Sequence, residues 1–202
     1  MPFFVSAAVV ALIVGFLVGW AAALVVFILG GGFFAFFFRD PPRQTPTVPG
    51  GVLSPADGRV LIAGDAQPDA SPPGTWQQVS IFLSPLDVHV NRIPVSGEVT
   101  AVRYQPGRYL PAYRAEAAAA NERCEIWIEQ GGQTIVVRQV VGVLARRVVC
   151  RVQPGQIVEA GDRYGIMKFG SRMDVFLPLS ARVRVSVGDR VVAGETLIAV
   201  LH

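Results

Sequence analysis

The first 38 residues contain no charged side chain and consist mostly of Ala, Val, Leu, Ile, Phe and Gly. An uncharged apolar run of about 18 or more residues is typical of a membrane-embedded segment, because only an internally hydrogen-bonded helix tolerates hydrocarbon. As one straight helix the run would measure about 57 Å, against about 30 Å for a bilayer core. We therefore expect a break at Gly30-Gly31-Gly32, with one span over about Phe3 to Leu29 and an interfacial aromatic patch from Phe33 to Phe38. A tight hairpin around Gly15 to Trp20 is the alternative.

A secretory signal peptide is the competing interpretation of this N-terminus. It requires a basic start and a short apolar core, whereas this run has no Lys or Arg and is too long. The first cations, Arg39 and Arg43, follow the run directly, and Asp40 partly offsets them. Because Lys and Arg are enriched on the cytoplasmic side of membrane helices, the order favours a domain on the cytoplasmic face of the cell (inner) membrane.

The chain carries a net charge of +3, and its arginines are scattered along the part that follows the apolar run. A basic surface beside a membrane suits anionic lipid headgroups, although a solvated arginine surface explains the same residues. There is no dense basic tract, so we expect no nucleic-acid partner. Cys124 and Cys150 lack metal-ligand spacing and fit a reducing compartment, and we expect both to be buried or inert. The sequence leaves a homo-oligomer open.

The remainder of the chain divides into a linker and one domain. Residues 39–51 are Pro-rich and cannot continue a helix. Residues 52–202 consist of short β-branched segments punctuated by Gly and Pro, which indicates a mostly-β domain. The segment Ala112–Ala120 has a helical composition. The predicted strands are Gly58–Ala63, Gln78–Leu83, Gly97–Tyr104, Cys124–Gln130, Gln133–Val141, Arg147–Val152, Tyr164–Met167, Asp174–Leu179, Arg182–Val187 and Thr196–Leu201.

Two segments 33 residues apart repeat one pattern. The first runs from Arg151 through Gly155 to Ala160-Gly161, and the second from Arg184 through Gly188 to Ala193-Gly194. Each is predicted to be a strand, a Gly turn, a short strand, an Ala-Gly turn and a strand. The constant offset favours a genuine repeat over the Gly turns common to β proteins. Two interlocked units of this kind resemble the barrel-sandwich hybrid of biotinyl- and lipoyl-type domains, and we predict that fold with an N-terminal membrane helix.

Three further segments place reactive residues in tight loops. Residues 54–60 contain Asp57-Gly58, a turn signal that by itself explains Asp57. Residues 83–94 contain His89, which is the plausible imidazole acid or base because the other histidine is the last residue. A structural role is the alternative for His89. No second His or Cys lies nearby, so we predict no metal site. Residues 165–175 contain Gly170-Ser171, a dipeptide that is common in β-turns.

Together these segments resemble the phosphatidylserine decarboxylase family in its short prokaryotic form. The resemblance rests on SPADGRV at 54–60, LSPLDVHVNRIPVSG at 83–97, the stretch 107–123, and GIMKFGSRMDVFLP at 165–178. It implies a proenzyme that cuts itself between Gly170 and Ser171 and converts Ser171 into a covalent pyruvoyl cofactor. It also implies that phosphatidylserine, a membrane lipid, is decarboxylated to phosphatidylethanolamine through a Schiff base with that group.

The residue types agree with the roles that the resemblance implies. Attack of a serine hydroxyl on the preceding carbonyl needs a strained turn with little steric cover, and Gly170 provides both. β-Elimination then separates a β chain, residues 1–170, from an α chain that begins at the modified Ser171, and we expect interleaved strands to hold the two fragments together. His89, oriented by Asp57, is the expected base for the attack and the expected proton donor in decarboxylation.

The chain departs from longer family members at two positions. They carry a second histidine three residues after the first, where this chain has Arg92, and usually Thr where it has Arg172. Whether His89 serves both cleavage and decarboxylation, or Arg92 takes an electrostatic share, is therefore open. Arg92 and Arg172 are candidates for binding the substrate. Further residues that could shape the site are Asn121, Glu122 and Arg123.

Two other functions compete with the enzyme. In a carrier module, Lys168 would bear biotin or lipoate in a hairpin of the lipoyl-like repeat, although a surface cation also explains Lys168. A non-enzymatic membrane adaptor would explain the apolar run and the repeat. Neither alternative explains Asp57 and His89 together with Gly170-Ser171, so the decarboxylase is the preferred hypothesis.

Overall fold

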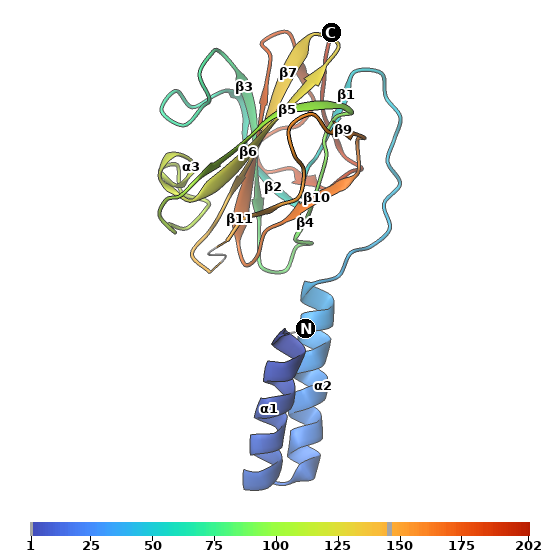
Figure 1. Cartoon of the computed structure of the whole chain (residues 1–202), viewed down its shortest axis with the longest axis vertical. Helices are drawn as coiled ribbons and strands as arrows, with labels where there is room; N and C mark the ends of the chain where they lie inside the picture. The colour runs from blue at the N-terminus through green and yellow to red at the C-terminus, as the bar shows by residue number, and fades with distance from the viewer. Residues whose placement is uncertain (1, 145–146) are drawn as a thin grey trace. The chain divides into compact units, whose positions relative to one another are not determined.

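A computed structural model of the chain describes residues 2–144 and 147–202. The chain separates into two units, one ending at Asp40 and one that extends from Pro41 to His202 (Figure 1).

The N-terminal unit is a helical hairpin. Helix α1 (Pro2–Leu17) and helix α2 (Trp20–Phe37) are joined at Gly19, which has a φ of 120°. A β-carbon at Gly15 would lie 2.8 Å from the Trp20 ring, so the bare backbone of Gly15 lets the two helices pack closely. The hairpin alternative is therefore confirmed, and the single span Phe3 to Leu29 is wrong.

The expected break at Gly30-Gly31-Gly32 is also wrong, because α2 continues through these residues. Each glycine weakens a helix by about 1 kcal/mol in water. In an apolar segment, however, a backbone group released from the helix would lack any partner, which costs several kcal/mol. The helical hydrogen bonds are therefore retained, and Phe33 to Phe37 belong to the helix rather than to a separate patch.

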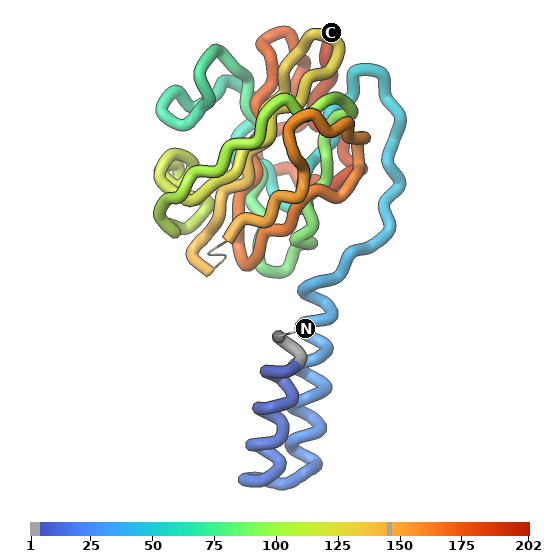
Figure 2. The backbone as a smooth tube through the Cα atoms, in the orientation of Figure 1, coloured from blue at the N-terminus to red at the C-terminus, as the bar shows by residue number. Residues whose placement is uncertain are grey.

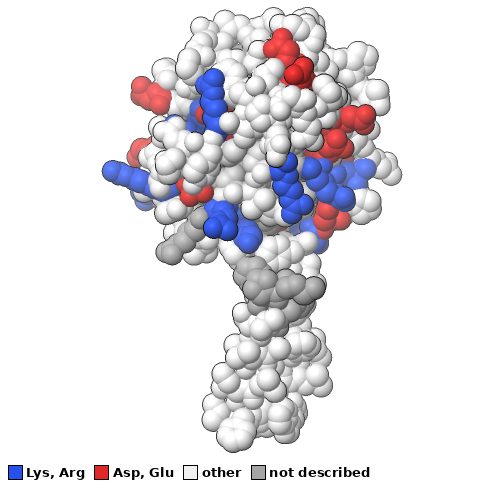
Figure 3. All heavy atoms as spheres, viewed as in Figure 1, with Lys and Arg blue, Asp and Glu red and all other residues white. Residues whose placement is uncertain are grey.

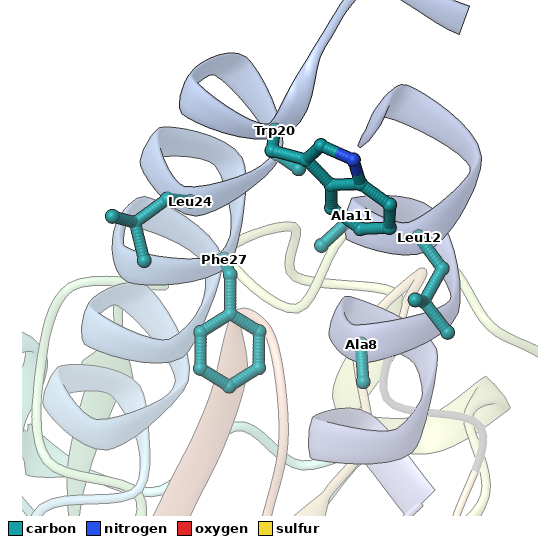
Figure 4. A pocket seen from close by; sticks show the side chains of 7 residues that line it. Ala8, Ala11, Leu12, Trp20, Leu24 and Phe27 are labelled. Carbon is teal, nitrogen blue, oxygen red and sulfur yellow. The ribbon is translucent and has the colours of Figure 1, made fainter. Parts of the chain in front are cut away.

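Helix α2 is apolar and long enough to cross a membrane, with 18 residues and a mean hydropathy of 2.2. This favours membrane association of the N-terminal unit. A groove of about 530 Å³ between the two helices is lined by apolar side chains, with the ring of Trp20 at one end and that of Phe27 farther along α2 (Figure 4). The surface of the hairpin thus suits contact with hydrocarbon.

The second unit is built almost entirely from antiparallel strands. One sheet has the order β13-β2-β3-β11-β7-β6-β5-β9, and two smaller sheets have the orders β1-β14-β12 and β4-β10-β8. A single short helix, α3 (Ala117–Ala120), is assigned among the described residues of this unit. The strands are β1 (Gly51–Leu53), β2 (Gly58–Asp65), β3 (Gln77–Leu83), β4 (Val90–Arg92), β5 (Gly97–Gln105), β6 (Arg123–Gln130), β7 (Gln133–Val140), β8 (Val149–Cys150), β9 (Ile157–Val158), β10 (Arg163–Ile166), β11 (Ser171–Leu177), β12 (Arg182–Val183), β13 (Arg190–Val191) and β14 (Leu197–Val200).

The mostly-β prediction is therefore confirmed, with local differences. Strand β11 begins at Ser171 rather than at Asp174, because its polar first residues are buried between β3 and β7. Strand β12 stops at Val183 instead of Val187. The helical composition of Ala112–Ala120 gives a single turn, α3. The short strands β1 and β4 were not predicted, since three residues are too few to show a period.

The core lies between the large sheet and the two small ones. Inward residues of β3 and β11, such as Ile81 and Val175, join Ile198 of β14 and Ile93 in one buried cluster. Full burial of such side chains contributes about 1.5–3 kcal/mol each. Residues 171–202 supply β11 at the centre of the large sheet and also β13 and β14.

The internal repeat is present as two equivalent sets of hydrogen bonds. The Gly155 amide donates to Val99 O and the Gly188 amide to Val60 O. One turn later, the Gly161 amide donates to Ile93 O and the Gly194 amide to Ser54 O. All four glycines have a positive φ, and a β-carbon at Gly194 would lie 3.6 Å from Gly161 Cα. The two Ala-Gly turns therefore pack against each other. Together with the equivalent hydrogen bonds, this contact indicates that an approximate two-fold axis relates the two repeats.

Part of the linker forms a strap along the β unit, which Figure 2 shows as the pale blue trace after residue 40. Arg43 Nη2 donates to both carboxylate oxygens of Asp57, at 2.9 and 2.8 Å, and the Gln44 amide donates to Glu195 Oε1. Because Arg43 is anchored in this way, the Pro-rich segment is fixed on the domain rather than acting as a free spacer.

Candidate active site

Two loops that are distant in sequence run beside each other at one end of the β unit. Residues 84–89 connect β3 to β4, and residues 167–170 connect β10 to β11. At one end Leu83 pairs with Ser171, and at the other end Val90 pairs with Ile166. The Met167 amide also donates to His89 O at 3.1 Å. The topology thus brings the His89 loop against the Gly170-Ser171 loop, as the functional hypothesis requires.

The turn before Ser171 is strained. Among the described residues, Phe169 is the one non-glycine with a positive φ, 53°, and Gly170 follows with a φ of 73°. A left-handed conformation costs an ordinary L-residue about 1–2 kcal/mol. Ser171 is fully buried, and its Oγ donates to Lys168 O at 3.2 Å. The predicted strained turn at Gly170 is therefore present, and it also includes Phe169, which was not predicted to be strained.

The peptide between Gly170 and Ser171 is closely surrounded by two further loops. A β-carbon at Gly142 would lie 1.8 Å from Gly170 O and 3.6 Å from Ala112 Cβ, so the backbone of Gly142 rests directly on the Gly170 carbonyl. On the other side, a β-carbon at Gly170 would lie 4.0 Å from the Pro85 ring. Gly142 was not predicted from the sequence, because a contact that arises only from tertiary packing leaves no local sequence pattern.

Asn121 and Glu122 fasten these surrounding loops. Asn121 Nδ2 donates to Leu110 O and to Val141 O, both at 2.8 Å, and Asn121 Oδ1 accepts from the Leu110 amide. Glu122 accepts from Tyr109 Oη at 2.9 Å and from the Val148 amide. Both side chains are buried, so they hold Gly142 in place beside the Gly170 carbonyl. Arg123 instead donates to Ala119 O on the exposed side.

Asp57 lies at the meeting point of the repeat turns. Besides Arg43, its Oδ1 accepts from the Ala193 amide at 2.8 Å. In the other repeat Ser96 Oγ makes the equivalent bond to the Ala160 amide at 2.9 Å. These contacts give Asp57 a structural task, and its orientation of His89 stays a prediction. His89 itself is 2% exposed.

The two candidate substrate-binding arginines are both buried. Arg92 Nη1 donates to Gly161 O at 2.9 Å, which places it at the repeat turns. Arg172 Nε bonds Asp174 Oδ1 at 2.6 Å, and Nη2 bonds Ser80 Oγ at 3.0 Å. Asp174 is completely buried, so this ion pair lies inside the large sheet. A structural role explains Arg172 fully, and this geometry gives no support to its contact with substrate.

The two cysteines lie close to each other and to Tyr164 in the β unit. Both are free thiols, Cys124 on β6 and Cys150 on β8. A hydrogen bond from Cys124 lowers the pKa of the Cys150 thiol, and the same bond together with burial raises the pKa of Cys124. Tyr164 is fully buried beside them, and burial is the main cause that raises its pKa well above the usual value. Cys124 is buried as expected, whereas Cys150 is partly exposed.

The sequence of the chain is similar to known proteins over most of its length. Residues 31–199 match the family model of phosphatidylserine decarboxylase. The chain belongs to the phosphatidylserine decarboxylase family. It is 44% identical over 202 residues to the phosphatidylserine decarboxylase proenzyme of Nitrosomonas europaea, covering 100% of this chain and 93% of the relative. It is also 48% identical over 183 residues to the proenzyme of Chlorobium chlorochromatii, covering 90% and 82%, and 47% identical over 178 residues to that of Mycolicibacterium smegmatis, covering 86% and 77%.

The family resemblance seen in the sequence is thus confirmed, and the chain is identified as a decarboxylase of the lyase class. The relatives are named as proenzymes, a word for precursors that mature by cleavage. The strained turn at Phe169-Gly170 and the enclosed Ser171 are the candidate active site of this chain. Among residues 2–144 and 147–202, no group of three or more His, Cys, Asp or Glu is placed to hold a metal ion.

Proposed function

We propose that this protein is a membrane-anchored proenzyme that cuts itself between Gly170 and Ser171 and then decarboxylates phosphatidylserine to phosphatidylethanolamine. The observation that carries the proposal is the strained turn of Phe169 and Gly170, which presents an enclosed peptide bond directly before a buried serine. Strain in the reactant lowers the barrier to any step that releases it. Family membership supplies the substrate class.

Self-cleavage begins when Ser171 Oγ adds to the Gly170 carbonyl carbon and the peptide C–N bond breaks. The peptide becomes an ester, and the hydroxyl proton ends on the freed amine. β-Elimination then breaks the ester C–O bond, giving a carboxylate on Gly170 and a dehydroalanine at position 171. Addition of water and loss of ammonia leave a pyruvoyl group there.

We assign the base for this sequence to His89. Its backbone carbonyl accepts from Met167, at the far end of the cleavage loop, so the imidazole belongs to the loop that flanks the scissile bond. A group with a pKa near neutrality is suited to take the serine proton. Orientation of the imidazole by Asp57 remains part of the proposal, and Asp57 also holds the strap and the Ala193 turn.

The surroundings of Ser171 fit a pyruvoyl group. Gly142, Ala112 and Pro85 form small, largely apolar walls that leave room for a ketone and keep bulk water away. When present, this group supplies an electron sink for the substrate's amino-acid headgroup. His89 returns the proton that replaces the lost carboxylate, because decarboxylation consumes one proton per turnover. Arg92 is nearer to the repeat turns than to a defined phosphate site, so its role in substrate binding remains a prediction.

The fold explains how the fragments stay together after the cut. The α chain, from position 171 onward, contributes β11 between β3 and β7, β13 against β2 and β14 against β1, all of which belong to the β chain. The two-fold arrangement of the Gly155–Gly161 and Gly188–Gly194 units supports the barrel-sandwich hybrid as the finer fold type.

We further propose residues 1–38 as the membrane anchor, 39–51 as the linker and 52–202 as the catalytic domain, placed on the cytoplasmic face of the inner membrane. The apolar hairpin supports the anchor. Arg39 and Arg43, directly after the apolar run, support the cytoplasmic orientation.

Purified full-length protein and its Ser171→Ala variant test the proposal. On incubation with phosphatidylserine vesicles, the wild type should appear as two fragments in a denaturing gel and should produce phosphatidylethanolamine. The variant should remain one chain and produce none. Cleavage of the variant at the same bond, or lipid conversion by a chain that stays whole, would overturn the mechanism.

A further inference from the structure

The three loops that surround the scissile bond share a second property. Pro85, Ala112 and Gly142 each face the Gly170 region, and each is followed at once by a large apolar side chain that points into solvent. These side chains are Leu86, 66% exposed, Tyr113, 59% exposed, and Val143 and Leu144, 47% and 66% exposed. We call this set of four residues the apolar rim.

The apolar rim differs from the other exposed apolar residues of the β unit. Tyr104, Ile157, Leu179 and Val187 are 58–72% exposed, but they belong to four separate strands or turns. Single exposed hydrophobic residues are normal, whereas a group gathered around a site marks an interaction surface. The Tyr113 ring packs edge-on against Phe82, with the ring centroids 5.9 Å apart. This contact fixes the position of Tyr113 although its side chain is largely exposed.

Basic side chains accompany the apolar rim. Arg108, Arg114 and Arg147 are exposed on the same loops as Tyr113, Val143 and Leu144. In the view of Figure 3, most of the visible Lys and Arg side chains lie in the lower half of the β unit, the half that carries these loops. Apolar side chains flanked by cations are the combination that binds the surface of an anionic bilayer, where each cation contributes about 1 kcal/mol.

We infer that the apolar rim docks the active site onto an anionic lipid bilayer, with Leu86, Tyr113, Val143 and Leu144 inserted among the lipid chains. This inference rests on the proposed function, because a diacyl substrate must deliver its headgroup to Ser171. Removing an acyl chain from the bilayer costs about 0.8 kcal/mol per CH₂, so the site must approach the lipid rather than the reverse. Four side chains suffice because the apolar hairpin of the same chain keeps the local concentration of bilayer high.

The first test reads the environment of the rim directly. An environment-sensitive fluorophore is attached to Leu144→Cys in the Ser171→Ala background, with Cys124→Ala and Cys150→Ala removing the native thiols, in full-length protein reconstituted into vesicles containing phosphatidylserine. The matched control is Leu179→Cys, which is 58% exposed at the opposite end of β11. We expect a blue-shifted emission, quenched by brominated acyl chains, at position 144 and an aqueous spectrum at position 179. An aqueous spectrum at both positions would overturn the inference, and because this readout needs no catalysis, failure of the proposed function would leave it readable.

The second test uses the ratio of two activities. The double variant Leu86→Ser/Leu144→Ser should lose at least tenfold in kcat/KM on phosphatidylserine in vesicles relative to the monomeric, water-soluble dihexanoyl lipid. The variant Leu179→Ser should keep the wild-type ratio. An unchanged ratio in the double variant contradicts docking, whereas absence of wild-type activity on both lipids contradicts the proposed function instead.

Discussion

The α-carbon of Gly142 lies against the carbonyl oxygen of Gly170, so that a β-carbon at position 142 would be only 1.8 Å from that oxygen. Contact at this distance is impossible, and the atom in the way is backbone, which cannot rotate aside. Gly142 therefore determines where the carbonyl of the peptide before Ser171 can lie. In the proposed cleavage this oxygen also receives the negative charge when Ser171 attacks.

Gly142→Ala should slow self-cleavage at least a hundredfold, equivalent to about 2.7 kcal/mol in the barrier, because the Gly170 carbonyl is pushed out of the geometry for attack. Denaturing gels after timed expression measure this rate. Hydroxylamine, which cuts an ester but not the peptide, should also fail to cut the variant, since the ester does not form. Val143→Ala is the matched control and should cleave at the wild-type rate. Normal cleavage of Gly142→Ala would remove Gly142 from the mechanism.

Asp57 can be tested for chemistry separately from structure, because the repeat shows which residue replaces it structurally. Ser96 makes in one repeat the turn bond that Asp57 makes in the other. Asp57→Ser should therefore keep the fold but cleave at least tenfold more slowly, since it cannot orient His89. Arg43→Met, which removes the ion pair and leaves Asp57 in place, should cleave normally. Unchanged cleavage in Asp57→Ser would show that Asp57 serves the turn alone.

The buried ion pair of Arg172 and Asp174 predicts an asymmetry in stability. Asp174→Ala leaves a guanidinium uncompensated inside the large sheet and should lower the free energy of unfolding by about 3–5 kcal/mol. Replacing both partners, Arg172→Met with Asp174→Leu, should recover most of that loss. Urea unfolding in the uncut Ser171→Ala background measures both, with the exposed Arg182→Met as control. Equal losses in the single and double variants would show that the pair is not the source of the effect.

Tyr164 predicts how stability depends on alkaline pH. Its phenol has a raised pKa in the folded state, so the unfolded chain releases the proton first as pH rises past about 10. The wild type should therefore lose stability above that pH, by up to about 1.4 kcal/mol per pH unit, and Tyr164→Phe should lose less. The Tyr164 hydroxyl has no hydrogen-bond partner among the described residues, so the variant should be at least as stable at pH 7. Urea midpoints between pH 7 and 11 provide the measurement, and identical alkaline slopes would refute the assignment.

The sequence was sufficient for the features that depend on local chemistry. Gly170 before Ser171 predicted a strained turn, and the spacing of Gly155 and Gly188 predicted the repeat. The apolar N-terminus predicted one membrane helix, with a helical hairpin only as the alternative. Gly30 to Gly32 suggested the wrong break, because a glycine run interrupts a helix readily only where water can satisfy the backbone.

The features that sequence could not predict arise from tertiary contacts. Gly142 touches Gly170 because β7 and β11 are neighbours in the sheet, and Asp57 meets Arg43 and Ala193 because the strap and the second repeat converge. Arg172 was predicted to bind the substrate, but β11 begins at Ser171 and the arginine side chain is buried in an ion pair with Asp174, so its contact with the substrate stays a prediction.

The intact mass of the purified protein under denaturing conditions shows whether the chain cuts itself before position 171. We expect two species, one ending at Gly170 and one running from position 171 to His202. The smaller species should be lighter than the serine-started peptide by one ammonia and should lack a reactive N-terminal amine. A single species of the full 202-residue mass from protein that is active on phosphatidylserine would contradict the account.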